Sequence, residues 1–269
     1  MIQVSNSLKC SYNLVKGSPK QRQKSVEKLT DKIFDELTTH VYEENDLCKF
    51  KMSDFKKVLK ENTPEHKTVS IKSIDSKDSQ GETIYMNDRK GNVTGIRMRL
   101  PYKNNVCDAA SIPTFMHETT HYFDHLYNPK YTARIEKMNK SKQYDDELYD
   151  EVFNQFYKFE RKKSPEEKAK VIANCEQAVR KFLEPKTVEE QIDFIQDMRY
   201  EMITETNAYK MGRKYANRML NKEIDTWDDD LQNRCGDYMF KEKAEMLKRI
   251  GFETIQKERA RLAELYGNK

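Results

Sequence analysis

The stretch TFMHETTHYFDH, residues 114–125, holds three of the five histidines of this 269-residue chain. Ser111-Ile-Pro113 precedes it and supplies a candidate N-cap and a proline suited to a first helical turn. A helix is therefore expected over residues 112–127. On that helix His117 and His121 are four positions apart, so both imidazoles project from one face, about one turn apart.

The segment His117-Glu-Thr-Thr-His121 has the spacing HExxH. Two neutral imidazoles at this spacing can bind zinc, and Glu118 can then accept a proton from water that the metal activates. The alternative is a polar helix whose histidines face solvent. Asp124 is either an acceptor for the second ring N–H of a ligand histidine or an ordinary polar residue near the helix end. We expect His125 to lie beside the site or to be exposed and not to be a ligand, since two turns along a straight helix is too far.

A catalytic zinc site needs three protein ligands and one open position. Position 124 is Asp and position 127 is Tyr, which excludes a third histidine in the metzincin arrangement and favours a carboxylate. The candidate is Glu205, in RYEMITETNAYKMGRKYANRML, residues 199–220, and Glu201 is the alternative. Glu205 shares a predicted helical face with two methionines and two small residues, Met198, Met202, Ala208 and Gly212. The small residues would let another helix approach closely.

The bulk composition excludes several classes of protein. Charged residues make up 35% of the chain, but 49 basic and 45 acidic residues are interleaved, so we expect no nucleic-acid partner. Five cysteines without a CxxC pair argue against a disulfide framework or a Cys-rich metal site and favour a reducing compartment. No segment has the length of a membrane span. The expected localisation is cytoplasmic, with association with a virion as the alternative, and we expect no membrane partner.

Residues 67–100 carry the clearest β signal. The runs ETIYMN and VTGIRMRL flank the turn sequence DRKGN and predict a hairpin, with TVSIKSI as a third strand. The rest reads as helices near 18–47, 52–61, 112–127, 143–162, 165–183, 187–222, 227–248 and 250–265, two of them with capping boxes at Ser164–Glu167 and Thr187–Glu190. The predicted fold class is α+β and mostly α, with a small antiparallel sheet packed on the HExxH helix and additional long helices.

An HExxH helix after a small sheet, followed by Glu-x-x-Ala on a later helix, resembles the gluzincin metallopeptidases. Thermolysin, the anthrax lethal factor protease and the ImmA/IrrE-like proteases belong to that set. The resemblance covers roughly residues 80–127 and 199–220. It implies a zincin-like metallopeptidase domain over residues 67–269 that carries a polar helical insert at about 128–198. A helical N-terminal region, residues 1–66, would precede it.

The same resemblance implies a role for each site residue. His117, His121 and Glu205 would bind Zn²⁺, and Glu118 would be the general base of a zinc metalloendopeptidase that hydrolyses a peptide or protein substrate. One departure is Tyr209, which stands where thermolysin-like enzymes have an acidic residue.

Three further expectations complete this reading. Tyr200, Tyr209 and Tyr238 are equal candidates for stabilising an oxyanion. The strand at 93–100 is expected to be an edge strand that pairs with an extended substrate peptide, since Gly95 would let a second backbone approach closely. The N-terminal region and the insert would shape access to the site or bind a protein partner.

A function of a different class fits the same composition. High charge and long helices also suit a non-catalytic structural or interaction protein that retains a zinc site, for example a component of a phage particle.

Overall fold

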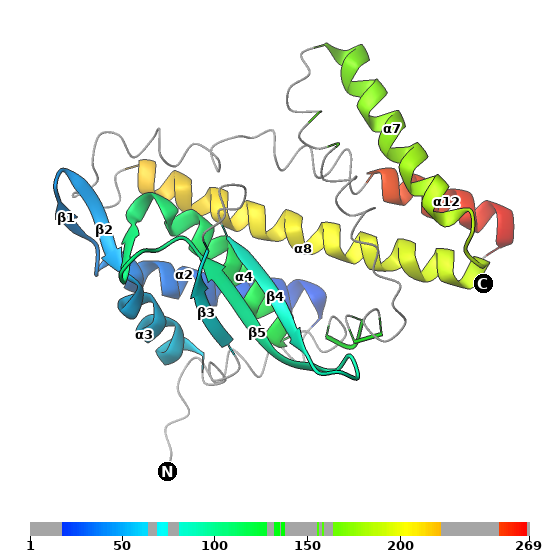
Figure 1. Ribbon diagram of the computed structural model, residues 1–269. Coiled ribbons are helices and arrows are strands. Elements are labelled where there is room, and N and C mark those ends of the chain that lie inside the picture. The colour runs from blue at the N-terminus through cyan, green and yellow to red at the C-terminus, as the bar shows by residue number, and fades with distance from the viewer. Residues whose placement is uncertain are drawn as a thin grey trace. The chain divides into compact units, whose positions relative to one another are not determined.

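The computed structural model describes residues 18–63, 69–74, 81–127, 132–134, 136–137, 155, 158, 164–221 and 253–267 (Figure 1). Its helices and strands, in chain order, are α2 (Pro19–Thr38), β1 (Tyr42–Glu44), β2 (Leu47–Lys51), α3 (Met52–Asn62), β3 (Val69–Ser73), β4 (Glu82–Asn87), β5 (Val93–Leu100), β6 (Val106–Asp108), the 3₁₀ turn η2 (Ala109–Ser111), α4 (Ile112–Tyr127), α7 (Pro165–Leu183), α8 (Val188–Leu220) and α12 (Glu253–Tyr266). The expected α+β, mostly helical fold class is confirmed. The helices expected at 143–162 and 227–248 lie largely or wholly outside the described residues.

The chain divides into two compact units. One comprises Met1–Lys137 with Ala208–Met239, and the other comprises Met138–Asn207 with Phe240–Lys269. The division falls inside α8, which is one continuous helix. The domain boundaries expected from the sequence stay predictions.

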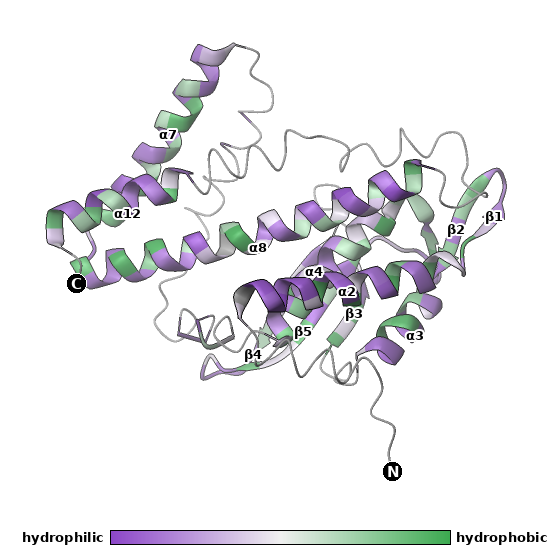
Figure 2. Ribbon diagram, turned by 180° about the vertical axis from the view of Figure 1, so that it is seen from behind, coloured by the Kyte–Doolittle hydropathy of each residue, from purple (hydrophilic) through white to green (hydrophobic). Residues whose placement is uncertain are grey.

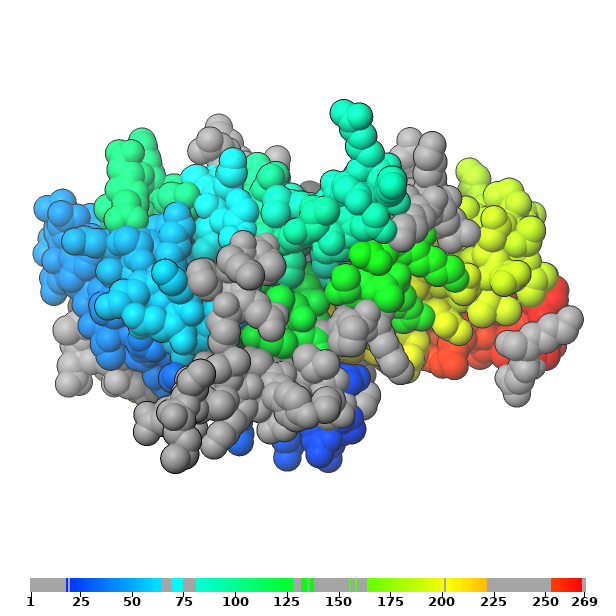
Figure 3. Space-filling view, turned by 90° about the horizontal axis from the view of Figure 1, so that it is seen from below, coloured from blue at the N-terminus to red at the C-terminus, as the bar shows by residue number. Residues whose placement is uncertain are grey.

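Strands β3, β4 and β5 form one sheet in the order β3-β5-β4. The expected β4–β5 hairpin is confirmed: Asp88 Oδ1 accepts hydrogen bonds from the backbone N–H groups of Lys90 and Asn92, and Gly91 has φ +80°. Residues 87–90 of this turn are exposed, and the hairpin segment, in teal, is visible at the surface in Figure 3. The third strand is also confirmed, but β3 runs parallel to β5, so the sheet is mixed and not antiparallel as expected.

The edge-strand expectation for residues 93–100 is wrong. β5 pairs with β3 on one side and with β4 on the other, so both of its edges are hydrogen-bonded within the chain. Gly95 lies buried inside this paired sheet, and Ile96, Met98 and Leu100 are buried with it. Alternating apolar residues suit the middle strand of a sheet as well as its edge, which is why the pattern did not separate the two. Among the described strands, β4 is the edge on this side.

A second sheet, in the order β1-β2-β6, was not expected from the sequence. The helix expected over 18–47 ends at Thr38. Asn45 and Asp46 adopt left-handed φ values of 55° and 60° and form the turn between β1 and β2. Asn105, which follows β5, then caps α3: its backbone carbonyl and side-chain Oδ1 accept hydrogen bonds from the N–H groups of Met52 and Ser53.

The main hydrophobic core surrounds α4, which is buried along most of its length. Phe115 of α4 packs edge-on against the rings of Phe50 and Phe55, with centroids 5.1 and 4.8 Å apart. Helices α2 and α3 and strand β5 contribute the surrounding side chains. The outward side of α2 is mainly hydrophilic (Figure 2). The core therefore fixes α4 as the central helix of its unit.

The second unit contains α7 and α12, which pack on one another. Both expected capping boxes are confirmed, at Ser164 before α7 and at Thr187 before α8. On α12 the buried carboxylate of Glu258 accepts hydrogen bonds from Arg180 and Arg261. None of the helices in the described part of the chain combines the length and the apolar character of a membrane span.

Candidate metal centre

The N-cap before the histidine helix is not directly next to α4, because a short 3₁₀ turn lies between them. Asp108 accepts a hydrogen bond of 2.8 Å from the backbone N–H of Ala110 and so caps the turn η2, which runs directly into α4 at Ile112. Ser111, expected as the N-cap, instead donates its hydroxyl to the carbonyl of Asp108. The polar residue that starts this helical segment is thus Asp108.

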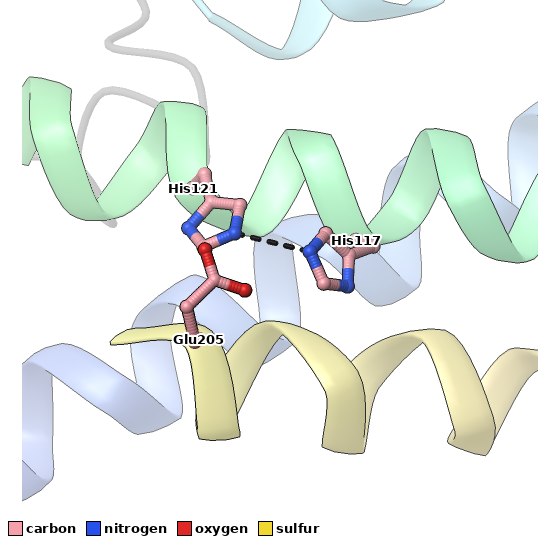
Figure 4. A group of neighbouring side chains, drawn as sticks. All are labelled: His117, His121 and Glu205. Atoms are coloured by element: carbon pink, nitrogen blue, oxygen red, sulfur yellow. Dashed lines mark hydrogen bonds between the residues drawn. The ribbon is translucent and has the colours of Figure 1, made fainter. Parts of the chain in front are cut away.

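His117 and His121 meet on one side of α4. Their Nε2 atoms lie 3.1 Å apart, their rings are at 71° to one another, and each residue is only 6% exposed. Glu205 of α8 completes the group, because one ligand atom from each of the three residues lies within 4.8 Å of the others. Figure 4 shows the Glu205 carboxylate directed toward His121.

This geometry suits a shared metal ion. Ligand atoms about 2.0–2.1 Å from a tetrahedral ion lie about 3.3 Å from each other. The two histidine nitrogens are already at 3.1 Å. A carboxylate oxygen of Glu205 lies within 4.8 Å of a ring nitrogen of each histidine. Two imidazoles and a carboxylate can therefore hold a metal ion here.

The C-terminal part of α8 is held against the α2 and α4 core by specific contacts. The ring of Tyr209, one turn after Glu205, packs edge-on against His117 with centroids 4.6 Å apart. Further along, Tyr215 stacks on Phe34 at 4.6 Å and donates a 2.9 Å hydrogen bond to Asp31. These contacts hold the part of α8 after Asn207 within the same unit as α4.

The face of α8 around Glu205 is packed as the sequence indicated. Met198, Met202, Ala208 and Gly212 are all buried, and Glu205 itself is half-buried. The side chain of the alternative ligand, Glu201, lies outside the described part of the structure.

The side chain of Glu118 extends from α4 to the start of β4. Its carboxylate is 5% exposed and accepts a 2.6 Å hydrogen bond at Oε2 from the hydroxyl of Thr83. Gly81 packs on the same group: a Cβ at this position would lie 2.9 Å from Glu118 Oε1 and 2.7 Å from Thr114 Cγ2. The strand therefore determines where the carboxylate can lie.

His125 is buried beside the group but is not part of it. Its Nδ1 is hydrogen-bonded to the hydroxyl of Tyr85, and its ring stacks at 6.1 Å on that of His121. Burial, with a further effect from His121, holds the pKa of His125 well below its usual range, so the ring is neutral. Of the two expectations for His125, beside the ligands or exposed, the structure shows a buried ring beside His121, and whether it binds a metal stays a prediction.

The carboxyl group of Asp124 interacts electrostatically with the imidazole of His121. Burial raises the pKa of the Asp124 carboxyl to about 6, and the neighbouring His121 acts in the opposite direction. Its expected role as acceptor for a ligand histidine stays a prediction.

Sequence reasoning missed the β4 residues that contact α4. Gly81, Thr83 and Tyr85 alternate in the segment GETIY, so they share one face of the strand. This period of two was visible, but only the packing of β4 on α4 shows that the face meets Glu118 and His125. Of the three tyrosines considered for an oxyanion, Tyr209 lies against His117, whereas Tyr238 lies outside the described residues.

Comparisons with protein-family models, with curated proteins and with solved structures each found no match. The resemblance to gluzincins therefore rests on the HExxH segment and on the position of Glu205.

Proposed function

We propose that this protein is a zinc-dependent metalloendopeptidase. The observation that carries the proposal is the convergence of His117 and His121 of α4 with Glu205 of α8, while Glu118 lies between the two histidines in the chain. Two histidines and one glutamate are the ligand set of catalytic zinc in one class of peptidases, and three protein ligands leave one position open.

In this proposal His117, His121 and Glu205 hold the ion and Glu118 handles the proton. Zinc, when bound, supplies Lewis acidity that activates water and polarises the scissile carbonyl. Glu118 accepts the proton of the attacking water on its carboxylate and returns it to the leaving amine. The 5% exposure of Glu118 supports this role, because electrostatic interactions strengthen where water is excluded.

The substrate in this proposal is an extended peptide beside β4. Among the described strands β4 pairs only with β5, and its Thr83 and Tyr85 contact α4 at Glu118 and His125. A peptide that adds to this edge gains main-chain hydrogen bonds next to the proposed base.

One observation favours a second function, a structural or interaction protein in which the metal only ties α4 to α8. His117, Glu118 and His121 are each at most 6% exposed, and a metal that only cross-links helices needs no access for substrate. The two functions differ in whether Glu118 matters for anything except stability.

A peptidase assay with a matched pair of variants tests the proposal. The zinc-loaded protein should cleave a generic fluorescent protein substrate, and Glu118→Gln should lower turnover by at least about 100-fold while zinc content and circular dichroism stay unchanged. Glu43→Gln, which removes an exposed charge from β1, is the control and should leave turnover as it is. Zinc-loaded protein without any cleavage of several denatured substrates would support the structural function instead.

A further inference from the structure

Thr83 of β4 and Gly81, which immediately precedes β4, both lie close to Glu118. Thr83 Oγ1 lies 2.6 Å from Glu118 Oε2 and 3.3 Å from the Glu118 backbone oxygen, so the hydroxyl reaches both the side chain and the main chain of the same residue. Gly81, two positions earlier on the same face, leaves no room for a methyl group above Oε1. One carboxylate oxygen is thus hydrogen-bonded, and the other lies where a side chain at position 81 would collide with it.

The hydrogen bond from Thr83 has the length of a strong one. An O–H group that donates to a carboxylate gives separations of about 2.5–2.7 Å, and such bonds are roughly twice as strong as neutral ones. Both groups are at least partly buried, so water competes weakly for the donor. A glutamate side chain has three rotatable bonds, and this contact removes most of its orientational freedom.

The side of the sheet that makes these contacts is itself fixed. Thr83 is paired with Met98 of β5, and Glu82 beside it is paired with Arg99, which also donates a 2.8 Å hydrogen bond to the Glu82 carboxylate. Tyr85, on the same face as Thr83, is hydrogen-bonded to His125, about two turns after Glu118 on α4. The position of the Thr83 hydroxyl is therefore set by the pairing of β4 and by a second tie to α4.

We propose that Thr83 is the positioning residue of the general base: its hydroxyl, with Gly81 as a backbone stop, holds the Glu118 carboxylate in one orientation. Thr83 contacts Glu118 and acts through it. The inference rests on the proposed function, because it assigns Glu118 as the base, but the hydrogen bond itself can be tested without any turnover.

The kinetic test compares Thr83→Val, which keeps the shape and removes the hydroxyl, with Thr83→Ser, which keeps the hydroxyl. With zinc-loaded protein, Thr83→Val should lower kcat by about 10- to 100-fold with KM within about two-fold, since misplacement of a catalytic group by about 1 Å has an effect of that size. Thr83→Ser should restore kcat to within about three-fold of the original protein. Thr94→Val is the matched control, because Thr94 lies in β5 and donates to the Met86 carbonyl instead.

The second readout is a double-mutant cycle in urea with the metal removed by a chelator. If Thr83 and Glu118 are bonded, the shift in denaturation midpoint caused by Thr83→Val should fall to less than half in a Glu118→Ala background. The shift caused by Thr94→Val should be the same in both backgrounds.

The two readouts separate the two proposals. If Thr83→Val leaves kcat unchanged, or if the shifts in denaturation midpoint of the two substitutions simply add, the role of Thr83 is overturned. The proposed peptidase function then still stands. A coupled cycle in a protein that binds zinc and cleaves nothing would leave Thr83 as the residue that holds Glu118 and would overturn the peptidase function. Loss of kcat on Thr83→Val, rescue by Thr83→Ser and a coupled cycle together would support both.

Discussion

The Nε2 atoms of His117 and His121 lie 3.1 Å apart on successive turns of α4. Both residues are buried, and α4 is the central helix of its unit, so the packing of the core sets this separation. Glu205 reaches the pair from α8, whose C-terminal half is fixed by Tyr209 against His117 and by Tyr215 against Asp31. Preorganised ligands require little rearrangement when an ion binds.

The first prediction is that the protein binds about one zinc ion per chain through these three residues. His121→Ala and Glu205→Ala should each weaken zinc binding by more than about 100-fold, because each removes a ligand. His40→Ala removes a histidine far along the chain from the group and serves as the control. Zinc content after dialysis, measured by elemental analysis, reports the result. If Glu201→Ala releases the metal and Glu205→Ala does not, the third ligand has been assigned wrongly.

Gly81→Ala should lower turnover by about 10-fold or more without loss of zinc. The added methyl would lie 2.9 Å from Glu118 Oε1 and 2.7 Å from Thr114 Cγ2, so both side chains must shift, and the shift displaces the Glu118 carboxylate. Steady-state kinetics with parallel zinc analysis checks this. Unchanged kcat would mean that the position of the Glu118 carboxylate does not limit the reaction.

Cys107 should resist alkylation in the folded protein. Burial raises the pKa of its thiol from 9.0 to about 12, and Lys56 acts weakly in the opposite direction. The thiolate is the reactive form, so iodoacetamide at about pH 8 should modify the Cys107 peptide only after denaturation, as mass spectrometry can show.

The sign of the pH effect on stability follows from the same shift. The folded thiol has the higher pKa, so the folded state binds the proton more tightly and this contribution to stability is full below pH 9. It is lost as the pH rises from 9.0 to about 12. Cys107→Ala should remove this part of the alkaline decline in urea denaturation. A decline of equal size in the variant would assign the effect to other groups.

Some elements could be predicted from the sequence because local chemistry determines them. Ser164 and Thr187 each stand three residues before a glutamate, and both form the expected capping boxes. The HExxH spacing likewise placed His117 and His121 on one face of a helix whose bounds, Ile112–Tyr127, match the expected ones. Glu205 could be singled out because small residues flank it on a buried face.

Other features depend on contacts between distant segments. Strand β1 and the turn after it were read as the end of the helix expected over 18–47, because only Asn45 and Asp46 interrupt the pattern there and both residues occur in helices as well. The direction of β3 and the central place of β5 depend on which strands pair, and alternation of apolar residues is the same for each arrangement. The hydrogen bond between Thr83 and Glu118 depends on how β4 packs on α4, and the residue spacing within each segment does not predict this packing.

The last prediction concerns the contact that holds α8 to α2. Asp31 Oδ1 accepts hydrogen bonds from the Tyr215 hydroxyl at 2.9 Å and from Lys214 Nζ at 2.6 Å, and Tyr215 is fully buried. Burial and the charge of Asp31 raise the pKa of Tyr215, so its hydroxyl stays a donor. Asp31→Ala would leave this donor buried without its acceptor, at a cost of about 1–3 kcal/mol.

Asp35→Ala is the matched control, since Asp35 pairs with Arg218 on the same two helices but its side chain is 58% exposed. An exposed pair of this kind contributes about 0–1 kcal/mol, so urea denaturation should show a clearly larger loss for Asp31→Ala. Because zinc binds only the folded chain, zinc at about 100 times its Kd should return about 2.7 kcal/mol to Asp31→Ala, as to the original protein, and nothing to His121→Ala. Equal losses for Asp31→Ala and Asp35→Ala would show that the buried Tyr215 bond is not what anchors the C-terminal part of α8 to α2.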